Sequence, residues 1–329
     1  MLQDNLDSNL QKNFSGLIQE NISLKDKNWF ETGGNARYYA QPSNQKEFAQ
    51  ALEFAKIHNL EIFVLGEGAN ILISDEGFSG LVIKPQITEM NLLKSNVAAN
   101  SGEVTAGAGV KFSDLINFCL DNNLSGLEEF SGIPGTVGGS VYINIHYFEF
   151  LLSQFLTQAT VIKKSTGEIL RVDNAWFNFS YNQSTLLARE YFLVDATFKL
   201  KKVDALQAAY HKGRSAEIIR HRVKRYPYKG TCGSFFRNFY ESEVTVESAG
   251  KKMIYVAYYL DKIGVKGNLK VGGAIVSHQH ANMLVNLGNA TTHDIVELAR
   301  TMQQLVCDNF GITPKSECQM IGFKENPLL

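Results

Sequence analysis

The sequence predicts an α+β fold that is divided into more than one domain. Apolar runs broken by glycine-rich turns indicate short strands, as in "EIFVLGEGANILISDEGFSGLVIK" (61–84). Apolar residues at helical spacing indicate helices, which become dominant after residue 202. At 329 residues the chain is longer than one simple core organises, so two or three domains are expected.

The region before residue 203 is expected to combine helices with strands. Asn44 and Glu47 give a capping-box pattern at the start of a helix that includes "EFAQALEFAKIHN" (47–59). Further expected elements are the strands of 61–84, a strand at 104–110, a helix at 114–123 capped by Ser113, a hairpin at 159–173 and a long strand at 191–202.

A second region is expected after residue 202. Its expected elements are helices at 205–222 and 249–264, a helix at 291–311 that Thr292 caps and Gly311 ends, and a strand within 315–323. A domain boundary is therefore expected near residue 202, and a weaker change of composition places another near residue 84.

The composition argues against several classes of function. Lysine and arginine number 32 against 33 aspartate and glutamate, so nucleic acid is not expected as the main partner. The four cysteines lack zinc-ligand spacing, and no metal is expected. The N-terminus is polar and acidic, and no apolar run approaches the ~20 residues of a membrane span. A cytoplasmic monomer without a membrane partner is expected.

Two glycine-rich loops are candidate ligand sites. "VLGEGANILIS" (64–74) carries Gly66 and Gly68, a pair that lets backbone N–H groups approach a diphosphate. A Rossmann fingerprint needs a third glycine at position 71 and then a helix, whereas Ile71 begins a strand pattern. A Rossmann site is therefore rejected. "SGIPGTVGGS" (131–140) is typical of a loop wrapped around a ligand or of a surface loop.

Five longer motifs carry the strongest functional information. They occur in this order along residues 28–324: "GEGANILISDEGFSGLVI", "AGAGVKFSDLINFCLDNNLSGLEEFSGIPGTVGGSV", "CGSFFRN", "VGGAIVSHQHANMLVN" and "SECQMIGF". With these motifs the chain resembles the MurB family of flavoenzymes, the UDP-N-acetylenolpyruvoylglucosamine reductases of peptidoglycan precursor synthesis.

The resemblance implies a fold and a set of cofactors. The expected fold is a two-subdomain FAD-binding region of the vanillyl-alcohol-oxidase (PCMH) type, followed by a C-terminal α+β substrate-binding domain. The expected domains are an N-terminal arm (1–27), FAD-binding subdomains (28–84 and 85–202) and a substrate-binding domain (203–325). FAD and NADPH are the implied cofactors, and a UDP-sugar is the implied substrate. The segment between 239 and 270 resembles the shorter family type, which lacks an extra substrate-covering loop.

The implied reaction reduces an enolpyruvyl ether with hydride from reduced FAD and a proton from the protein. Ser234 matches the proton donor of the family, and Glu317 matches a glutamate that helps to stabilise or protonate the intermediate. A serine hydroxyl is a weak acid, so its neighbours must assist it. The positions matching FAD contacts are Gly66, Gly68, Ala69, Asn70, Ile71, Gly135, Thr136, Gly138, Gly139 and Asn144.

Substrate contacts are implied for a third group of residues. Their members are Tyr181, Arg225, Arg237, Asn238 and His280. Arg225 belongs to the basic run "RHRVKRYPYK" (220–229), which by itself is also compatible with a nucleic-acid patch or a solvated helix end. The resemblance and the neutral net charge favour a clamp for the substrate diphosphate. His280 is equally compatible with a substrate contact and with a structural role.

The chain departs from the family at three places. Asn182 follows Tyr181 where the family has an arginine that grips the substrate carboxylate; an amide brings neither charge nor a bidentate fork. Arg189 and Arg222 are candidate replacements. "NIHYFEF" (144–150) puts bulky residues where the family has small ones, and Phe239 stands where proline is common.

Two alternatives to a working reductase follow from these departures. The first is a protein that binds FAD and a UDP-sugar but has impaired or redirected catalysis, because Asn182 replaces the arginine. The second is an oxidase or dehydrogenase of the same flavin superfamily, with His146 as a candidate for covalent flavin attachment. Retention of both Ser234 and Glu317 favours the reductase.

Overall fold

The computed structural model describes residues 14, 16–96, 100–248 and 250–328. Most of the expected N-terminal arm (1–27) therefore lies outside the described residues. The described part of the chain forms two compact units. Unit 1 takes its residues from Met1–Asn21, Tyr38–Glu67 and Gly80–Arg220, and unit 2 from Ile22–Arg37, Gly68–Ser79 and His221–Leu329. The expected domain boundaries remain predictions.

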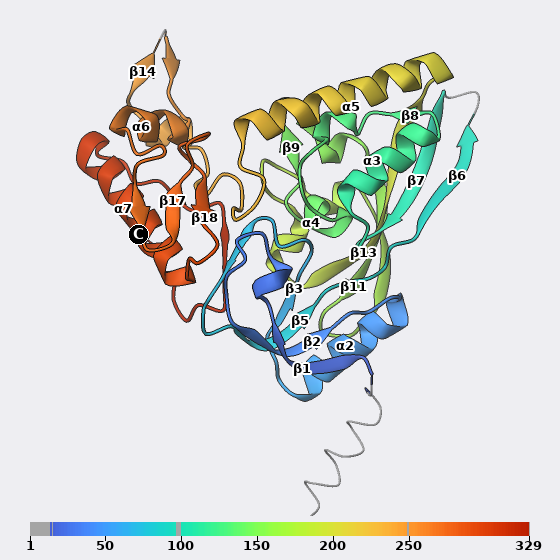
Figure 1. The fold of residues 1–329 in the computed structure, drawn as a ribbon. Helices are drawn as coiled ribbons and strands as arrows, with labels where there is room; N and C mark the ends of the chain where they lie inside the picture. Colours follow the sequence, from blue (N-terminus) through green and yellow to red (C-terminus); the bar gives the residue numbers. More distant parts are fainter. Residues whose placement is uncertain (1–13, 15, 97–99, 249, 329) are drawn as a thin grey trace, which may run out of the picture. The chain divides into compact units, whose positions relative to one another are not determined.

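Within the described residues, unit 1 contains an antiparallel sheet of six strands (Figure 1). Its strand order is β12 (Ile169–Asp173), β11 (Leu156–Lys163), β13 (Tyr191–Lys202), β7 (Ser101–Gly107) and β6 (Met90–Asn96), with β8 (Leu124–Ser125) beside β13. The helices α3 (Phe112–Asp121) and α4 (Val137–Tyr142) contribute to its core. Phe112, Phe130 and Phe198 are fully buried in this core. The packing of α3 and α4 on it sets where the loops before these helices lie.

A second sheet has the order β1 (Ile18–Ser23), β2 (Asn35–Ala40), β5 (Phe78–Ile83) and β3 (Ile62–Val64). The parallel pair β3–β5 lies in unit 1, where Phe48 and Leu52 of α2 (Gln45–Ile57) share a core with Leu81. The chain crosses between the units within β1, β2 and β5.

The long helix α5 (Ala205–Arg225) is fastened along unit 1 by polar pairs. His211 Nδ1 lies 2.7 Å from the buried carboxylate of Glu128, and Arg214 makes two bonds of 3.0 and 3.1 Å to Glu129. The last turn of α5 then carries Arg222, Lys224 and Arg225.

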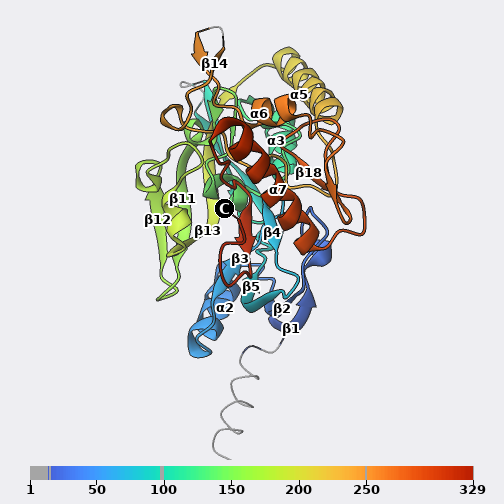
Figure 2. The same ribbon diagram turned by 90° about the vertical axis from the view of Figure 1, so that its left-hand side faces the viewer.

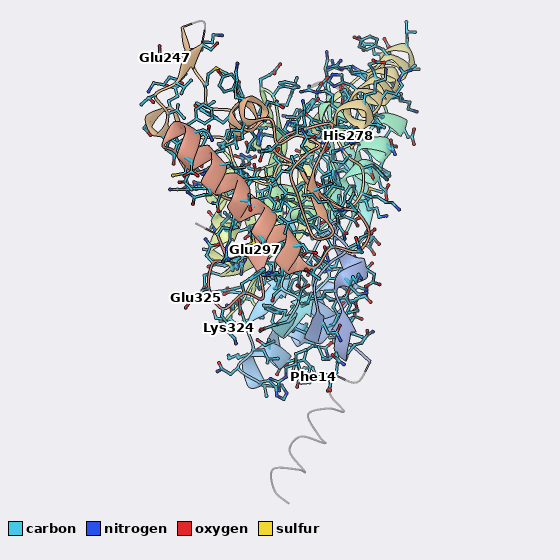
Figure 3. The ribbon with its side chains drawn as sticks, turned by 60° about the vertical axis from the view of Figure 1, so that its left-hand side comes forward. Phe14, Glu247, His278, Glu297, Lys324 and Glu325 are labelled. Carbon is cyan, nitrogen blue, oxygen red and sulfur yellow. The ribbon has the colours of Figure 1, made fainter. Side chains whose placement is uncertain are left out.

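Unit 2 contains the helices α6 (Val256–Ile263) and α7 (Thr292–Phe310). Its antiparallel strands β16 (Lys270–Val271), β17 (Ala274–Val276) and β18 (Leu284–Asn286) lie against α7 (Figure 2). A short hairpin joins β14 (Glu247–Ser248) to β15 (Lys251–Lys252). Figure 3 labels Glu297 on α7, where Arg300 lies 2.7 Å away on the polar face of the helix.

One parallel pair in unit 2 joins distant parts of the sequence. Strand β4 (Ile71–Ile73) pairs with β19 (Gln319–Ile321), with Ile71 opposite Gln319 and Ile73 opposite Ile321. The pairing extends to Ser74, whose N–H donates to Ile321 at 2.8 Å. The glycine loop before β4 is therefore held beside the segment before β19.

Several sequence predictions are confirmed. The three strands expected in 61–84 are β3, β4 and β5, and β13 has the expected bounds. Asn44 caps α2 by accepting from the Glu47 N–H, and the Glu47 carboxylate accepts from the backbone N–H of Ser43.

Three local predictions are wrong. Lys111, not Ser113, is the N-cap of α3, which spans Phe112–Asp121. Thr291 caps α7, because the Thr292 hydroxyl donates instead to the carbonyl of Ile73 at 2.6 Å. The expected helix at 249–264 begins only at Val256, since the residues before it form the β14–β15 hairpin. No helix in the described ranges is long and apolar enough to span a membrane.

Candidate functional site

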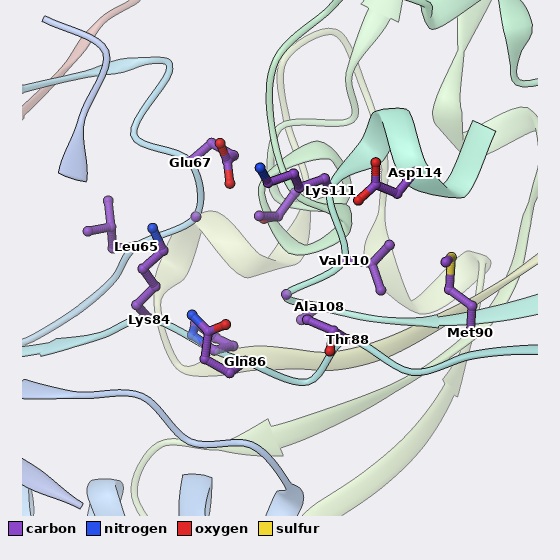
Figure 4. A pocket seen from close by; sticks show the side chains of 14 residues that line it. Leu65, Glu67, Lys84, Gln86, Thr88, Met90, Ala108, Val110, Lys111 and Asp114 are labelled. Atoms are coloured by element: carbon purple, nitrogen blue, oxygen red, sulfur yellow. The ribbon is translucent and has the colours of Figure 1, made fainter. Parts of the chain in front are cut away.

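Unit 1 contains a pocket of about 420 Å³ (Figure 4). Its lining residues are Leu65, Gly66, Glu67, Lys84, Pro85, Gln86, Thr88, Met90, Ala108, Gly109, Val110, Lys111, Asp114 and Thr136. The volume lies within the range of about 300–1,000 Å³ that is usual for ligand pockets. Gly66 and Thr136 are the two residues of this lining that the sequence analysis places in a site.

The two glycine loops meet at this pocket. A Cβ on Gly66 would lie 2.8 Å from Thr136 Oγ1, so a side chain at position 66 would displace the second loop. Thr136 is itself held in place because it caps α4 and accepts from the Gly139 N–H at 3.2 Å. The loops therefore approach each other closely through small residues.

The segment "AGAGVK" (106–111) forms another wall of the pocket. The Val137 N–H donates to the Val110 carbonyl at 2.8 Å, and the Gly138 N–H donates to the Ala108 carbonyl at 2.9 Å. A Cβ on Gly138 would lie 3.1 Å from that same carbonyl. These contacts explain why the loop at 135–139 needs glycine at position 138.

Four charged residues line the pocket. Lys84 and Lys111 bring positive charge, and Glu67 and Asp114 bring negative charge; Figure 4 shows their side chains around the hollow. The sequence analysis missed the lysines and the 108–111 segment. The sequence did contain a signal for the 108–111 segment, because a glycine-rich turn between a strand and a helix is typical of a ligand-binding loop.

A second group of predicted residues gathers elsewhere in unit 1. Asn144 is buried in the left-handed region (φ 47°), and its side chain donates to the Ser180 carbonyl at 3.1 Å and accepts from the Ser153 N–H at 3.0 Å. The Ser184 hydroxyl also donates to the Tyr142 carbonyl at 2.6 Å. These bonds join the loop after α4 to the segment at 180–184.

Asn182 interacts with His146 within this group. The Asn182 side chain hydrogen-bonds to His146, and the His146 ring lies 4.5 Å from the Tyr181 ring. Burial lowers the pKa of His146, while the bond to Asn182 opposes that effect. In the same unit, the Arg189 guanidinium lies 6.0 Å from the Phe63 ring centroid. Position 182 thus presents an amide bonded to a largely neutral imidazole.

The predicted residues of the first glycine loop that follow Gly66 lie in unit 2. Gly68 has φ 68°, and a Cβ there would lie 2.6 Å from Asn28 Cα. The loop continues into β4, where the Asn70 carbonyl accepts from the Gln319 N–H at 3.1 Å. The Asn70 side chain lies 3.5 Å from the Glu317 carbonyl. Residues 68–71 are therefore adjacent to Glu317.

Ser234 belongs to the same part of unit 2. The carbonyl of the next residue, Phe235, accepts from the Glu317 N–H at 2.9 Å and from the Cys318 N–H at 3.2 Å. Phe235 and Phe236 are fully buried, whereas Ser234 is partly exposed. The structure thus brings the backbone of Ser234 and Glu317 together next to Asn70.

Arg237 has an internal partner. It makes a bidentate ion pair with Glu243 at 2.8 Å for both bonds, and it stacks 4.3 Å from the Tyr240 ring. Hydrogen bonding from Arg237 lowers the pKa of Glu243 to about 2. Asn238 lies directly beside this pair, because its carbonyl accepts from Arg237 at 2.9 Å.

Arg225 and His280 both contact Tyr226. The Arg225 guanidinium lies 5.4 Å from the Tyr226 ring, and the His280 ring lies 5.5 Å from it. His280 Nδ1 accepts from the Asn282 N–H at 3.2 Å, and burial lowers the pKa of His280. The neutral imidazole thus has a structural partner. Within the described ranges no cluster of His, Cys, Asp or Glu is arranged to hold a metal ion.

Comparison with known protein families gives two matches. Residues 36–173 match the family described as "FAD binding domain". Residues 225–321 match the C-terminal domain of UDP-N-acetylenolpyruvoylglucosamine reductase.

Individual relatives are similar over nearly the whole chain. The UDP-N-acetylenolpyruvoylglucosamine reductase of Prochlorococcus marinus is 30% identical over 307 residues, which is 93% of this chain and 98% of that protein. The enzyme of Listeria innocua is 31% identical over 319 residues, or 96% and 99%. The crystal structure of the Thermus caldophilus reductase has a TM-score of 0.72 at 27% identity, covering 91% of this chain and 97% of that one. The predicted α+β fold class is confirmed.

The Arg237–Glu243 pair generates a prediction about acid stability. The pKa of Glu243 is lowered from 4.5 to about 2, so the pair stabilises the fold above pH 4.5 and that stabilisation is lost as pH falls toward 2. We expect the melting temperature of wild type to exceed that of Glu243→Gln at pH 5 and above, with the difference shrinking at lower pH. Glu247→Gln, at an exposed glutamate, should follow wild type. A difference that stays constant down to pH 2 would contradict the assignment.

Proposed function

Because the chain belongs to the UDP-N-acetylenolpyruvoylglucosamine reductase (MurB) family, we propose that it reduces UDP-N-acetylglucosamine enolpyruvate to UDP-N-acetylmuramate with NADPH. The observation that carries the proposal is the convergence of Asn70, Ser234 and Glu317 within unit 2. Glu317 is bonded through its backbone to Phe235, the residue after Ser234, and its carbonyl lies 3.5 Å from the side chain of Asn70, a residue of the first glycine loop.

The residues present fit FAD. The pocket in unit 1 has a suitable volume, two lysines and the closely packed Gly66, and Gly68 in unit 2 leaves equally little room for a side chain. Backbone without side chains and positive charge are what a diphosphate requires. When bound, FAD would take hydride from NADPH and deliver it to the terminal vinyl carbon of the substrate.

Ser234 supplies the proton to the neighbouring carbon in this proposal. A serine hydroxyl acts as an acid only where its alkoxide is stabilised or reprotonated. The fully buried Phe235 and Phe236 limit access of bulk water on one side of Ser234, which strengthens local electrostatic interactions. Glu317 would stabilise or protonate the intermediate, and its backbone bond to Phe235 supports a role next to Ser234.

The remaining site residues are proposed to hold the substrate. Arg225, at the basic end of α5, would bind the diphosphate together with Asn238 and Arg237. Arg237 has a charged partner in Glu243, so its contribution to the net positive charge is smaller than that of Arg225.

A second function is supported by the Asn182–His146 bond. If no cation replaces the missing arginine, the chain would bind FAD and the UDP-sugar but turn over slowly. Loss of one charge-assisted contact to a developing negative charge costs about 2–4 kcal/mol, or tens- to several-hundredfold in rate.

Stopped-flow absorbance at the flavin band tests the proposed reaction in its two halves. Anaerobic addition of NADPH should bleach the bound flavin, and the enolpyruvyl substrate should restore the colour. Ser234→Ala should leave the bleaching rate within about twofold of wild type and slow the recovery by about 10² to 10⁴-fold, which is the usual contribution of a general acid. Equal losses in both halves would contradict the role of Ser234.

The pocket assignment predicts a loss of cofactor affinity. The double variant Lys84→Gln, Lys111→Gln should weaken FAD binding by roughly tenfold, because each solvent-accessible charge contact contributes about 0.2–1 kcal/mol. Titration of apo-protein by flavin fluorescence quenching measures this, and the loss should shrink in high salt. Lys201→Gln, at an exposed lysine of β13, is the charge-matched control. An unchanged Kd in the double variant would place the cofactor elsewhere.

Asn182→Arg separates the two candidate functions. If another cation serves the substrate carboxylate, this variant should show flavin reoxidation equal to or slower than wild type. Asn182→Gln is the control. Asn182 has φ 54°, a left-handed backbone conformation that asparagine adopts more readily than most residues, so both replacements carry the same conformational cost. A rise of tenfold or more in Asn182→Arg alone would support the slow or redirected protein instead.

A further inference from the structure

The loop that carries Ser234 is fastened to one neighbouring segment at both of its ends. The Asn286 N–H donates to the Gly230 carbonyl at 2.7 Å, and the Phe235 N–H donates to the Asn282 carbonyl at 2.8 Å. Gly230 has φ 69°, and a Cβ there would lie 2.6 Å from the Asn286 carbonyl oxygen. The loop at 230–236 therefore has little freedom to shift along 282–286.

Asn282 adds a side-chain clamp to this arrangement. Its Oδ1 accepts from the Phe236 N–H at 3.1 Å, and its Nδ2 donates to the Phe236 carbonyl at 2.7 Å. Asn282 is only 3% exposed. One amide thus satisfies both backbone groups of Phe236, as a neighbouring strand would. The bonds are protected from competition by water because the amide is buried.

The opposite side of the segment is also bonded. The Phe235 carbonyl accepts from Glu317, and the Arg237 N–H donates to the Lys315 carbonyl at 3.0 Å. Residues 235–237 therefore lie between Asn282 on one side and 315–318 on the other. Ser234 precedes this fixed segment, so its hydroxyl position depends on how firmly Phe235 and Phe236 are held.

We propose that Asn282 is a positioning residue for proton transfer by Ser234. This inference rests on the proposed function, since it concerns the same proton. Asn282 touches no reacting atom; it holds the peptide units after Ser234 in register with Glu317. His280 extends the clamp, because its Nδ1 accepts from the Asn282 N–H and so fixes the backbone from which the amide projects.

The first test compares Asn282→Ala with Asn286→Ala in the FAD-loaded protein. Asn286 is also a buried amide, and its side chain bonds to Phe30, Gly288 and Ala290. Its backbone N–H, which bonds to Gly230, is kept in the alanine variant. Asn282→Ala should slow reoxidation of the flavin by substrate by about 10- to 100-fold, because small displacements of catalytic groups have effects of this order. Reduction by NADPH should stay within twofold. Asn286→Ala also removes buried side-chain hydrogen bonds and should lower the melting temperature, but it should keep both rates.

The second test uses Asn282→Asp, which keeps the size of the side chain. A protonated aspartic acid can donate to the Phe236 carbonyl and accept from its N–H, as asparagine does, whereas the carboxylate can only accept. Burial favours the neutral form. The reoxidation rate relative to wild type should therefore rise toward one as pH falls, while the reduction rate relative to wild type stays flat. A purely structural residue would give a constant ratio.

The outcomes separate this inference from the proposed function. Failure of the wild-type protein to reoxidise its reduced flavin with the enolpyruvyl substrate would overturn the proposed function itself, and a normal reoxidation rate in Ser234→Ala would overturn the role of Ser234. Slow reoxidation in Ser234→Ala combined with a wild-type rate in Asn282→Asp at a pH high enough to ionise the new carboxyl would overturn only the positioning role. If Asn282→Ala does not fold, the pH dependence of the reoxidation rate of Asn282→Asp still tests the positioning role.

Discussion

The peptide unit of Phe235 is the constraint on which the candidate chemistry depends. Its carbonyl accepts from Glu317 and Cys318, and its N–H donates to Asn282, so three segments meet at one residue. None of these bonds involves a reacting side chain. A buried peptide group that is bonded on both sides cannot move without leaving polar groups unsatisfied, which costs about 1–3 kcal/mol for each. The backbone that follows Ser234 is therefore held in place by these bonds.

The two units contain different candidate residues. Unit 1 contains a pocket lined by two lysines, two acidic residues and closely packed glycines. Unit 2 contains Ser234 and Glu317, which the proposed function assigns to proton transfer, and Arg225 and Arg237, which it assigns to the substrate. Asn182, at the position where the sequence analysis expects the substrate-binding arginine of the family, lies in unit 1. Its side chain hydrogen-bonds to His146, whose pKa is lowered by burial.

The sequence predicted elements well where the pattern was local. Strand β13 was predicted from its own residues, and α2 was predicted from its N-cap, Asn44. The cap of α7 was misplaced by one residue because the Thr292 hydroxyl has a partner in Ile73, which is distant in sequence. The cap of α3 was misplaced by two residues, since its N-cap Lys111 makes no side-chain capping bond that the sequence could reveal. The same limit applies to the site. Motifs predicted Ser234 and Glu317, whereas the clamp at Asn282 depends on a partner 46 residues away. Lys84 and Lys111 were missed because a lysine at a strand end or before a helix is usually solvated.

The parallel pairing of β4 with β19 has a consequence for how the chain is made. Asn70 and Glu317 are 247 residues apart, so translation at about 5–20 residues per second separates them by roughly 10–50 s. Throughout that interval the newly synthesised β4, with Ile71, Leu72 and Ile73 all destined for burial, has no partner strand among those described. An unpaired apolar strand is a surface that chaperones protect on the ribosome. The strand that follows the first glycine loop thus gains its partner only when synthesis is nearly finished.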